Sequence, residues 1–378
     1  MARANPLKTV KSQMILLNDL QRHNLSLEKS LKTCIDQILK NGWYVLGNEV
    51  KSFENEFSQY CQTNHCISVA NGTDALELAL RALGVTRDHQ VITVANAGGY
   101  STIALWTIGA TPVYVDIDSD TQLISIEHLE KRLNKNIAAV IVTHLYGHAA
   151  PVYDIVELIS KYNIPLIEDC AQAHGAMING KRVGSFGKLG CFSFYPTKNL
   201  GALGDGGAIV TDDLELAQRV TKLRQYGWER KYKSVMEGGR NSRLDELQAA
   251  LLRIKLPLLD TWNARRFAIC ERYTDGITHS LVKTPRITAQ SFVGHLFVVR
   301  TSRRDSLQNY LKNREIFTDI HYPIPDYRQP FCTEQYANLR LKETEMASAE
   351  VLSLPCFPEM TDFEVDAVIT AVNEWPGI

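Results

Sequence analysis

The sequence has no C-x-x-C pair, because its eight cysteines lie singly between Cys34 and Cys356. This spacing signals neither a zinc site nor a disulfide framework. The chain also has little continuous apolar sequence: the start is basic, but the apolar run that follows is too short for a signal peptide. No run approaches the about 20 residues that a membrane span requires. We therefore expect a cytoplasmic protein with reduced thiols and no metal site.

An excess of charge of one sign is also missing. The chain has 41 Lys and Arg residues against 42 Asp and Glu residues, a formal net charge of -1. This balance provides no field for steering nucleic acid or anionic membranes, and we expect neither as a partner. Two glycine-rich phosphate motifs, G-x-x-x-x-G-K-[ST] and G-x-G-x-x-G after a strand, are absent too. The absence of the second motif argues against a nicotinamide-dependent dehydrogenase. Small-molecule chemistry of another kind is expected.

What the chain does have is an alternation of short β-branched runs and helix-period segments from about His65 onward. Examples are "HCISVAN" then "DALELALRAL", "TPVYVDID" then "SIEHLEKRL", and "IAAVIVTHLYG" then "VYDIVELISKY", followed by "IPLIED". This pattern predicts an α/β fold with a mostly parallel sheet covered on both faces. In such sheets ligands bind beyond the carboxyl ends of the strands, so the loops there are the place to look for function.

The length of 378 residues and the 45% hydrophobic content suit two domains that share an interface. After about Arg240 the pattern changes to a long helical stretch and then to shorter alternating units. We predict an N-terminal arm over residues 1–30, a large domain over residues 31–245 and a smaller α/β domain over residues 246–378.

The first candidate site is "SVANGTDALELAL", which predicts a strand, a tight turn at Gly72 and Thr73, and a helix starting near Asp74. Free amide groups at a helix start, with the Thr73 hydroxyl beside them, suit a phosphate. An ordinary capped helix explains this feature equally well. The second candidate is "IPLIEDCAQAHG", where Asp169 ends a strand that reads as buried. A carboxylate in such a place needs a cationic partner, and a protonated pyridine nitrogen is one, although a structural Asp at a turn is the alternative.

The third candidate is Lys198 in "GCFSFYPTKNLGALGDGGAIVT". A lysine that forms a Schiff base must be partly desolvated so that its pKa falls, and nearby glycines let the backbone approach a flat cofactor. A lone lysine is usually a solvated charge. A phosphate cradle near Thr73, an acidic strand end at Asp169 and Ser193 five residues before Lys198 together match pyridoxal phosphate chemistry.

These motifs, "VANGTDAL", "EDCAQAHGA" and "FSFYPTKNLGALGDGGAIVT", resemble in order and spacing those of the DegT/DnrJ/StrS-type sugar aminotransferases. That family is a branch of the fold type I pyridoxal phosphate enzymes. The resemblance extends from "GWYVLGNEVKSFENEF" to "HYPIP" and so covers most of the chain. It implies a large mostly parallel α/β/α domain, a smaller C-terminal α/β domain, and pyridoxal 5'-phosphate as cofactor.

The resemblance also implies roles for individual residues. Lys198 would form the Schiff base with the cofactor and shuttle the proton, and Asp169 would pair with the pyridinium nitrogen. Gln172 would lie near the phenolic oxygen of the ring, and Gly72, Thr73 and Ser193 would hold the phosphate. Asn241 matches an asparagine that reaches the phosphate from the neighbouring subunit, which implies a homodimer with shared active sites.

One position departs from the family pattern. Relatives usually have an aromatic residue stacked on the cofactor where this chain has Gly98, within "ANAGGYSTIAL". We expect either that Tyr100, two residues later, supplies the ring or that stacking is weaker in this chain.

The resemblance is strongest to members that aminate a dTDP-linked 3-keto-6-deoxyhexose, on the segments "RQYGWERKY", "NSRLDELQAALLRIKL", "GHLFVVR" and "IHYPIP". It implies L-glutamate as amino donor and ping-pong transamination. The cleft for the nucleotide sugar is expected to include Tyr226, Lys231, Tyr232, His321 and Tyr322, although Lys231 could equally be a solvated charge and His321 could only order its turn. Alternatives are amination of a 4-keto nucleotide sugar or a cyclitol ketone, and a non-catalytic regulatory protein with the same fold.

Overall fold

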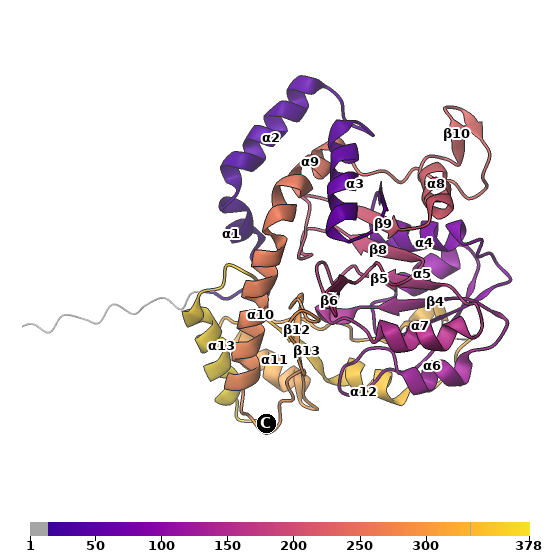
Figure 1. The fold of residues 1–378 in the computed structure, drawn as a ribbon. Helices are drawn as coiled ribbons and strands as arrows, with labels where there is room; N and C mark the ends of the chain where they lie inside the picture. The colour runs from indigo at the N-terminus through magenta and orange to yellow at the C-terminus, as the bar shows by residue number, and fades with distance from the viewer. Residues whose placement is uncertain (1–13, 333) are drawn as a thin grey trace, which may run out of the picture.

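The computed structural model of the chain describes residues 14–332 and 334–378. Its centre is a seven-stranded sheet in the order β1-β9-β8-β5-β4-β2-β3 (Figure 1). Strand β9 runs antiparallel to both of its neighbours, and the remaining adjacent pairs are parallel. The strands are β1 (His65–Val69), β2 (Gln90–Thr93), β3 (Thr111–Tyr114), β4 (Ile137–Thr143), β5 (Leu166–Asp169), β8 (Leu189–Ser193) and β9 (Gly207–Thr211). The predicted mostly parallel sheet is therefore confirmed.

Helices cover both faces of this sheet, because its strands are apolar on both sides. Val91 of β2 and Ile141 of β4 contact the core on one face, whereas Ile92 and Val140 contact the core on the other. This alternation follows from the two-residue period of a strand. Burying each such side chain stabilises the fold by about 1.5–3 kcal/mol. One face is covered by α4 (Gly72–Ala82), α5 (Tyr100–Thr107) and α8 (Leu214–Leu223), and the other by α3 (Asn48–Tyr60), α6 (Ile126–Arg132), α7 (Val152–Ser160) and α9 (Glu246–Lys255).

A second, smaller core lies around the antiparallel pair of β12 (Phe297–Arg300) and β13 (Val351–Leu354). Ile15, near the start of the described chain, packs into this core and forms a bridge with Ile316. The smaller α/β unit expected in the C-terminal part is therefore present, while the exact boundaries at residues 30 and 245 stay predictions. Its helices are α10 (Leu259–Gly276), α11 (Arg304–Lys312) and α13 (Asp362–Asn373), whereas α12 (Lys342–Glu350) packs with Ala347 into the core of the large sheet.

The long helical stretch expected after residue 240 is broken in two. Pro257 lies in a 3-10 turn, Leu256–Leu258, between α9 and α10. Proline lacks the N–H that continues an α-helix, so the α-helical hydrogen bonding is interrupted here before α10 begins. The N-terminal helices are α1 (Leu20–Leu25) and α2 (Glu28–Asn41), and α2 packs along α9 (Figure 1).

Two small hairpins complete the fold, β6 (Met177–Ile178) with β7 (Lys181–Arg182), and β10 (Trp228–Arg230) with β11 (Lys233–Ser234). The β10 hairpin projects from the body at the upper right of Figure 1. Three further 3-10 turns are Leu145–Gly147, Asp326–Arg328 and Pro330–Cys332. Among the helices that the structure describes, none combines the length and apolar character required to cross a membrane.

Candidate active site

A cavity of about 640 Å³ lies where β1, β5 and β8 end, between the large sheet and the smaller C-terminal core. This is the edge of a parallel sheet at which ligand sites form. Nine of the residues predicted from the sequence line the cavity: Gly72, Thr73, Tyr100, Asp169, Gln172, Ser193, Lys198, His321 and Tyr322. The structure thus brings together residues that are up to 250 positions apart, from Gly72 to Tyr322.

The N-terminus of α4 forms one wall of the cavity. Asn71 caps the helix, its side-chain oxygen accepting from the N–H of Asp74 at 2.8 Å. Ser193 packs so closely against Gly72 that a Cβ added to this glycine would lie 2.7 Å from the Ser193 Cβ. Two hydroxyl side chains, Thr73 and Ser193, therefore flank the exposed amides of a helix start, which is an arrangement that suits an anion.

Two ionisable side chains line the cavity, Asp169, which is buried, and Lys198, which is half-buried. Asp169 is 6% exposed, and its Oδ1 accepts from the N–H of Ala171 at 3.1 Å. Burial raises the pKa of Asp169, while that N–H and the Lys198 charge partly offset the effect. Lys198 lines the cavity, and burial lowers the pKa of its amine to about 8. Within the described residues no ion pair joins Asp169 and Lys198, although the charge of each acts on the pKa of the other.

The glycine-rich loop after Lys198 is packed against backbone. A Cβ added to Gly207 would lie 2.4 Å from the Asn71 carbonyl oxygen, which excludes larger residues where β9 passes the start of α4. Buried Lys255 of α9 fixes the middle of the loop, because its amine donates to the Gly201 carbonyl at 2.8 Å and to the Asn24 side chain at 3.2 Å. These glycines therefore serve close packing around the Lys198 turn as well as any approach of a ligand.

Gln172 is held in one orientation by two hydrogen bonds. Its Oε1 accepts from the N–H of Tyr146 at 2.6 Å, and its Nε2 donates to the hydroxyl of Tyr322 at 2.9 Å. Since a backbone N–H can only donate, the amide orientation follows from chemistry. Burial raises the pKa of Tyr322 well above its usual value, so its hydroxyl keeps a proton that it can donate into the cavity.

Gly98, where the family pattern has an aromatic residue, lies directly against Tyr322. A Cβ at this position would come within 2.8 Å of the Tyr322 ring and 3.0 Å of the Tyr100 ring, and its φ of +82° is itself unfavourable for other residues. The two tyrosine rings meet edge to face with centroids 6.4 Å apart. The space beside position 98 therefore already contains aromatic side chains, and the role expected of Tyr100 stays a prediction.

His321 is held at the side of the cavity by the smaller core. Its Nδ1 lies 2.9 Å from the hydroxyl of Ser353, and its Nε2 lies 3.9 Å from Asp319. Burial lowers the pKa of His321, although Asp319 acts in the opposite direction.

Four of the predicted residues do not line the cavity of their own chain. Asn241 is exposed and follows the β10 hairpin, where it forms a bridge with Gln225. Tyr226, Lys231 and Tyr232 belong to the hairpin and its base, and Tyr232 is 79% exposed with the Lys231 amine 5.0 Å from its ring centroid. The structure therefore separates these residues from the nine that it brings together.

The cavity also has lining residues that the sequence motifs did not point to. They come from the N-terminal arm, from the loop after β8 and from the C-terminal part: Leu17, Asn18, Tyr195, Thr197, Asp205, His295, Leu296, Asp319, Leu354 and Cys356. The one available signal was a histidine next to the apolar run in "GHLFVVR".

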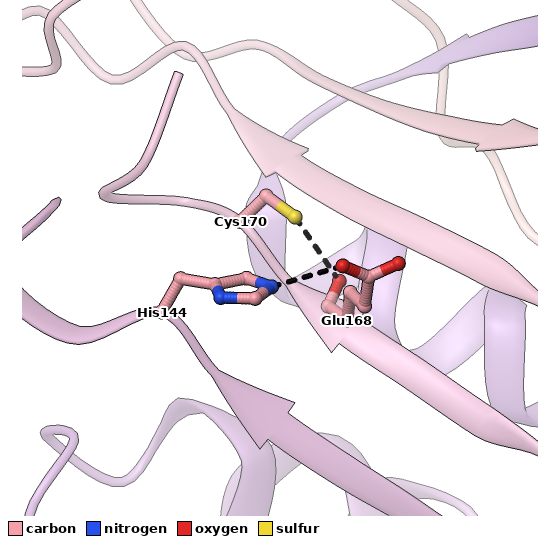
Figure 2. Close-up of side chains that lie close together, drawn as sticks. All are labelled: His144, Glu168 and Cys170. Carbon is pink, nitrogen blue, oxygen red and sulfur yellow. Dashed lines mark hydrogen bonds and ion pairs between the residues drawn. The ribbon is translucent and has the colours of Figure 1, made fainter. Parts of the chain in front are cut away.

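A separate buried cluster consists of His144, Glu168 and Cys170, at the end of β5 (Figure 2). His144 Nε2 is 3.0 Å from Glu168 Oε2, and Cys170 Sγ is 3.8 Å from the Glu168 backbone oxygen. His144 Nδ1 accepts from the N–H of Ala150 at 3.0 Å, so Nε2 carries the proton and donates it to Glu168. Both imidazole nitrogens are therefore used within the protein, and the trio acts as a structural hydrogen-bond cluster.

Comparison with known proteins shows which family the chain is similar to. Residues 26–373 match the DegT/DnrJ/EryC1/StrS aminotransferase family. The "dTDP-3-amino-3,6-dideoxy-alpha-D-galactopyranose transaminase" of Aneurinibacillus thermoaerophilus is 45% identical, over 96% of this chain and 99% of that protein. The crystal structure of Streptomyces venezuelae DesV with a ketimine intermediate superposes with a TM-score of 0.92 at 40% identity, covering 96% and 98% of the two chains.

A third similar structure is that of Bacillus subtilis NtdA with bound cofactor PMP, with a TM-score of 0.87 at 29% identity, over 92% of this chain and 81% of that one. These matches extend over nearly the whole chain. The fold, the cavity at the strand ends and the family match agree, and the protein belongs to the DegT/DnrJ/EryC1/StrS aminotransferase family.

Proposed function

We propose that the protein transfers the amino group of L-glutamate to the keto group of a dTDP-linked 3-keto-6-deoxyhexose. The observation that carries this proposal is that Lys198, whose pKa is lowered, and the buried Asp169 line one cavity together with the N-terminus of α4. Pyridoxal phosphate is the cofactor of the family, and when bound it supplies an electron sink for the carbon that gains or loses the amine.

The residues of the cavity fit that cofactor. The amides of Gly72 and Thr73 with the Ser193 hydroxyl match a phosphate, and the unpaired carboxylate of Asp169 matches a protonated ring nitrogen. A buried carboxylate of this kind is costly without a cation, so a cationic ligand removes a penalty that the cofactor-free protein bears. Lys198 is the amine that reaches the same space.

Lys198 is suited to move a proton at neutral pH. With a pKa of about 8, a useful fraction of its amine is neutral and nucleophilic, and the protonated remainder can return a proton to a substrate carbon. Gln172 and Tyr322 form a fixed donor pair at the cavity wall, since Tyr322 accepts from Gln172 and keeps its own proton for a ligand oxygen. Asn18 of the arm approaches the Thr197 carbonyl at 3.4 Å and so narrows the cavity beside Lys198.

The choice of a 3-keto sugar is supported by the names of similar proteins. The Aneurinibacillus transaminase is named for a dTDP-linked 3-amino sugar, and it covers 96% of this chain. A 4-keto nucleotide sugar or a cyclitol ketone is the runner-up, because the cofactor residues are the same for all three. L-Glutamate as donor is supported by the family resemblance and not by a particular side chain.

We also propose a homodimer in which each subunit completes the site of the other. Asn241, Tyr226, Lys231 and Tyr232 are outside the cavity of their own chain, which supports a role toward a neighbouring one. Two further exposed aromatic residues precede α3: Trp43 and Tyr44 are 62% and 53% exposed, and the adjacent Val45 forms a bridge with Asp245, in the segment that follows Asn241. A surface rich in aromatic residues is typical of a protein interface.

A cytoplasmic location is part of the proposal. In the described chain all eight cysteines are free and buried, which supports a reducing compartment. A non-catalytic regulatory role stays an alternative, but a protein with only that role has no need for the buried amine of Lys198 opposite Asp169.

The test uses the visible absorbance of the cofactor-loaded protein. L-Glutamate is added first to bleach the absorbance band, the donor is then removed, and dTDP-linked 3-keto and 4-keto sugars are added in parallel. We expect the band to return with the 3-keto sugar and not with the 4-keto sugar. Return with the 4-keto sugar alone would overturn the choice of carbon, and no bleaching by L-glutamate would overturn the choice of donor.

A further inference from the structure

His295 is a cavity residue to which the proposed function gives no role. It lies two residues before β12, is 7% exposed, and lines the same cavity as Lys198 and His321. Its Nδ1 lies 3.0 Å from the side-chain oxygen of Asn199, the residue directly after Lys198. Since Nδ1 is hydrogen-bonded to Asn199, the other ring nitrogen, Nε2, is available to a ligand in the cavity.

The tautomer of His295 follows from the hydrogen bonds of Asn199. The Asn199 Nδ2 donates to the Val293 carbonyl at 3.0 Å and to the Asn263 Oδ1 at 2.8 Å. A backbone carbonyl can only accept, so this end of the amide must be the nitrogen, and Oδ1 must face His295 as an acceptor. Asn263 is fixed in the same way, because its own Nδ2 donates to the His174 carbonyl at 2.7 Å.

His295 Nδ1 therefore carries a proton and donates it to Asn199. Burial, together with the nearby positive charge of Lys198, lowers the pKa of His295 well below its usual value, so the ring is neutral. A neutral imidazole with a proton on Nδ1 has a lone pair on Nε2. This nitrogen can accept one hydrogen bond but cannot donate one.

The Nε2 lone pair has no hydrogen-bond partner within the described residues, yet this nitrogen is not shut off from solvent inside the core. His174 provides a contrast, because both of its ring nitrogens are buried without a partner, whereas neither nitrogen of His295 belongs to that group. His295 borders the cavity, and the cavity is the route by which its Nε2 is reached.

We propose that His295 Nε2 accepts a hydrogen bond from a hydroxyl group of the sugar, on a carbon next to the keto carbon that is aminated. This inference rests on the proposed function and adds a residue that recognises the sugar. The donor half-reaction does not use the contact, because the carboxylates of L-glutamate are acceptors and its amino group, the one hydrogen-bond donor, is the group that is transferred. His295 is thus a specificity-determining residue for one half-reaction only.

The experiment measures the two half-reactions separately, by single-turnover absorbance of the cofactor-loaded enzyme. His295→Ala removes both contacts of the ring, while His295→Asn retains an amide that can donate to Asn199 and loses the acceptor in the cavity. His128→Asn is the matched control, because His128 on α6 does not line the cavity. The probes are L-glutamate, a dTDP-linked 3-keto-6-deoxyhexose, and the analogues of that sugar lacking the 2-hydroxyl or the 4-hydroxyl.

We expect both His295 variants to slow the sugar half-reaction about three- to tenfold, the range for loss of one neutral hydrogen bond. The rate of the L-glutamate half-reaction should change less than about twofold, because no hydrogen bond to His295 is lost in that half-reaction. The deoxy analogue that lacks the hydroxyl bound by His295 should react with the wild-type enzyme and with the variants at equal rates, because this analogue cannot form the hydrogen bond.

Equal slowing of both half-reactions by both variants would overturn the inference and leave His295 as a support for the Lys198 turn. A variant that still prefers the full sugar over both analogues as strongly as wild type would overturn it as well. If the wild-type enzyme reacts with none of the sugars, the proposed function fails first, and this is seen before any variant is compared.

Discussion

At the scale of single residues, Lys198 and Asp169 determine each other's protonation. Burial lowers the pKa of Lys198 to about 8, and the negative charge of Asp169 opposes that shift. For Asp169 the order is similar: burial raises its pKa, and Lys198 acts against the rise. Because the folded pKa of Lys198 is lowered, this lysine reduces the free energy of unfolding, and the full reduction applies below about pH 8. The reduction disappears as the pH rises from about 8 toward the unfolded pKa of 10.5.

The same pair predicts the reactivity of the cofactor-free protein. Reductive methylation of Lys198 by formaldehyde should increase with pH and have a midpoint near 8, because only the neutral amine reacts. Asp169→Asn should move the midpoint lower, since it removes the charge that raises the pKa of Lys198. Peptide mass spectrometry over a pH series measures both midpoints.

Lys255 is the internal control, because burial lowers its pKa to about 8 as well. Its amine donates hydrogen bonds to Gly201 and Asn24, and the residue does not line the cavity. Lys255 should therefore react far more slowly than Lys198 at every pH. A midpoint for Lys198 near 10.5, or one that moves upward in Asp169→Asn, would contradict the assignment.

At the scale of elements, β5 ends in two carboxylates with different roles. Glu168 and Asp169 are neighbours in a strand and so point to opposite faces. Asp169 faces the cavity, whereas Glu168 is fully buried and accepts from His144 and from the N–H groups of Gly184, Phe186 and Gly187, at 2.7–3.0 Å. These donors, of which Figure 2 shows His144, outweigh the effect of burial and lower the pKa of Glu168. The cluster fixes the direction in which β5 presents Asp169.

Replacing Glu168 by Gln should therefore destabilise the protein by about 3 kcal/mol at pH 7, because an amide N–H then faces backbone N–H groups. Urea unfolding measures the difference. Since the folded pKa of Glu168 is lowered, its contribution is present above the unfolded pKa and is lost as the pH falls through the folded value, so the deficit should shrink in acid. Glu127→Gln is the control, because Glu127 is exposed on α6, and a similar loss there would refute the special role of Glu168.

The elements of the large sheet could be predicted because their signals are local. Alternating runs such as "HCISVAN" and "DALELALRAL" become β1 and α4, and Asp169 ends β5 as expected. The tautomer of His295 could not be predicted, since Asn199 and Asn263 lie 96 and 32 positions away in the sequence and are brought together only by packing. Pro257 was visible in the sequence, but not that the helical chain would resume as α10 directly after one 3-10 turn.

At the scale of the whole molecule, the open question is where Asn241 acts. The nine predicted residues that line the cavity include every proposed cofactor contact except this one. Asn241 is exposed beside a hairpin that projects from the body (Figure 1). If it serves a neighbouring subunit, a complete site needs Lys198 from one chain and Asn241 from the other, as a twofold-symmetric dimer provides.

Mixed dimers test this arrangement. Lys198→Ala and Asn241→Ala should each be nearly inactive alone, because every site of each homodimer lacks one of the two groups. Subunits of the two variants are mixed under conditions that allow exchange, and transamination is measured before and after. Activity should rise, because in a mixed dimer the site with Lys198 of one chain receives Asn241 of the other and is wild type. The second site of that dimer lacks both groups.

The recovered rate should approach a quarter of the wild-type value at equal amounts, since random pairing makes about half of the dimers mixed and one of their two sites is intact. Mixing Lys198→Ala with Asp169→Asn is the matched control, because both residues line the cavity of their own chain and no exchange of subunits restores a site. If the pair with Asn241→Ala stays as inactive as this control, Asn241 acts within its own chain and the shared site is refuted.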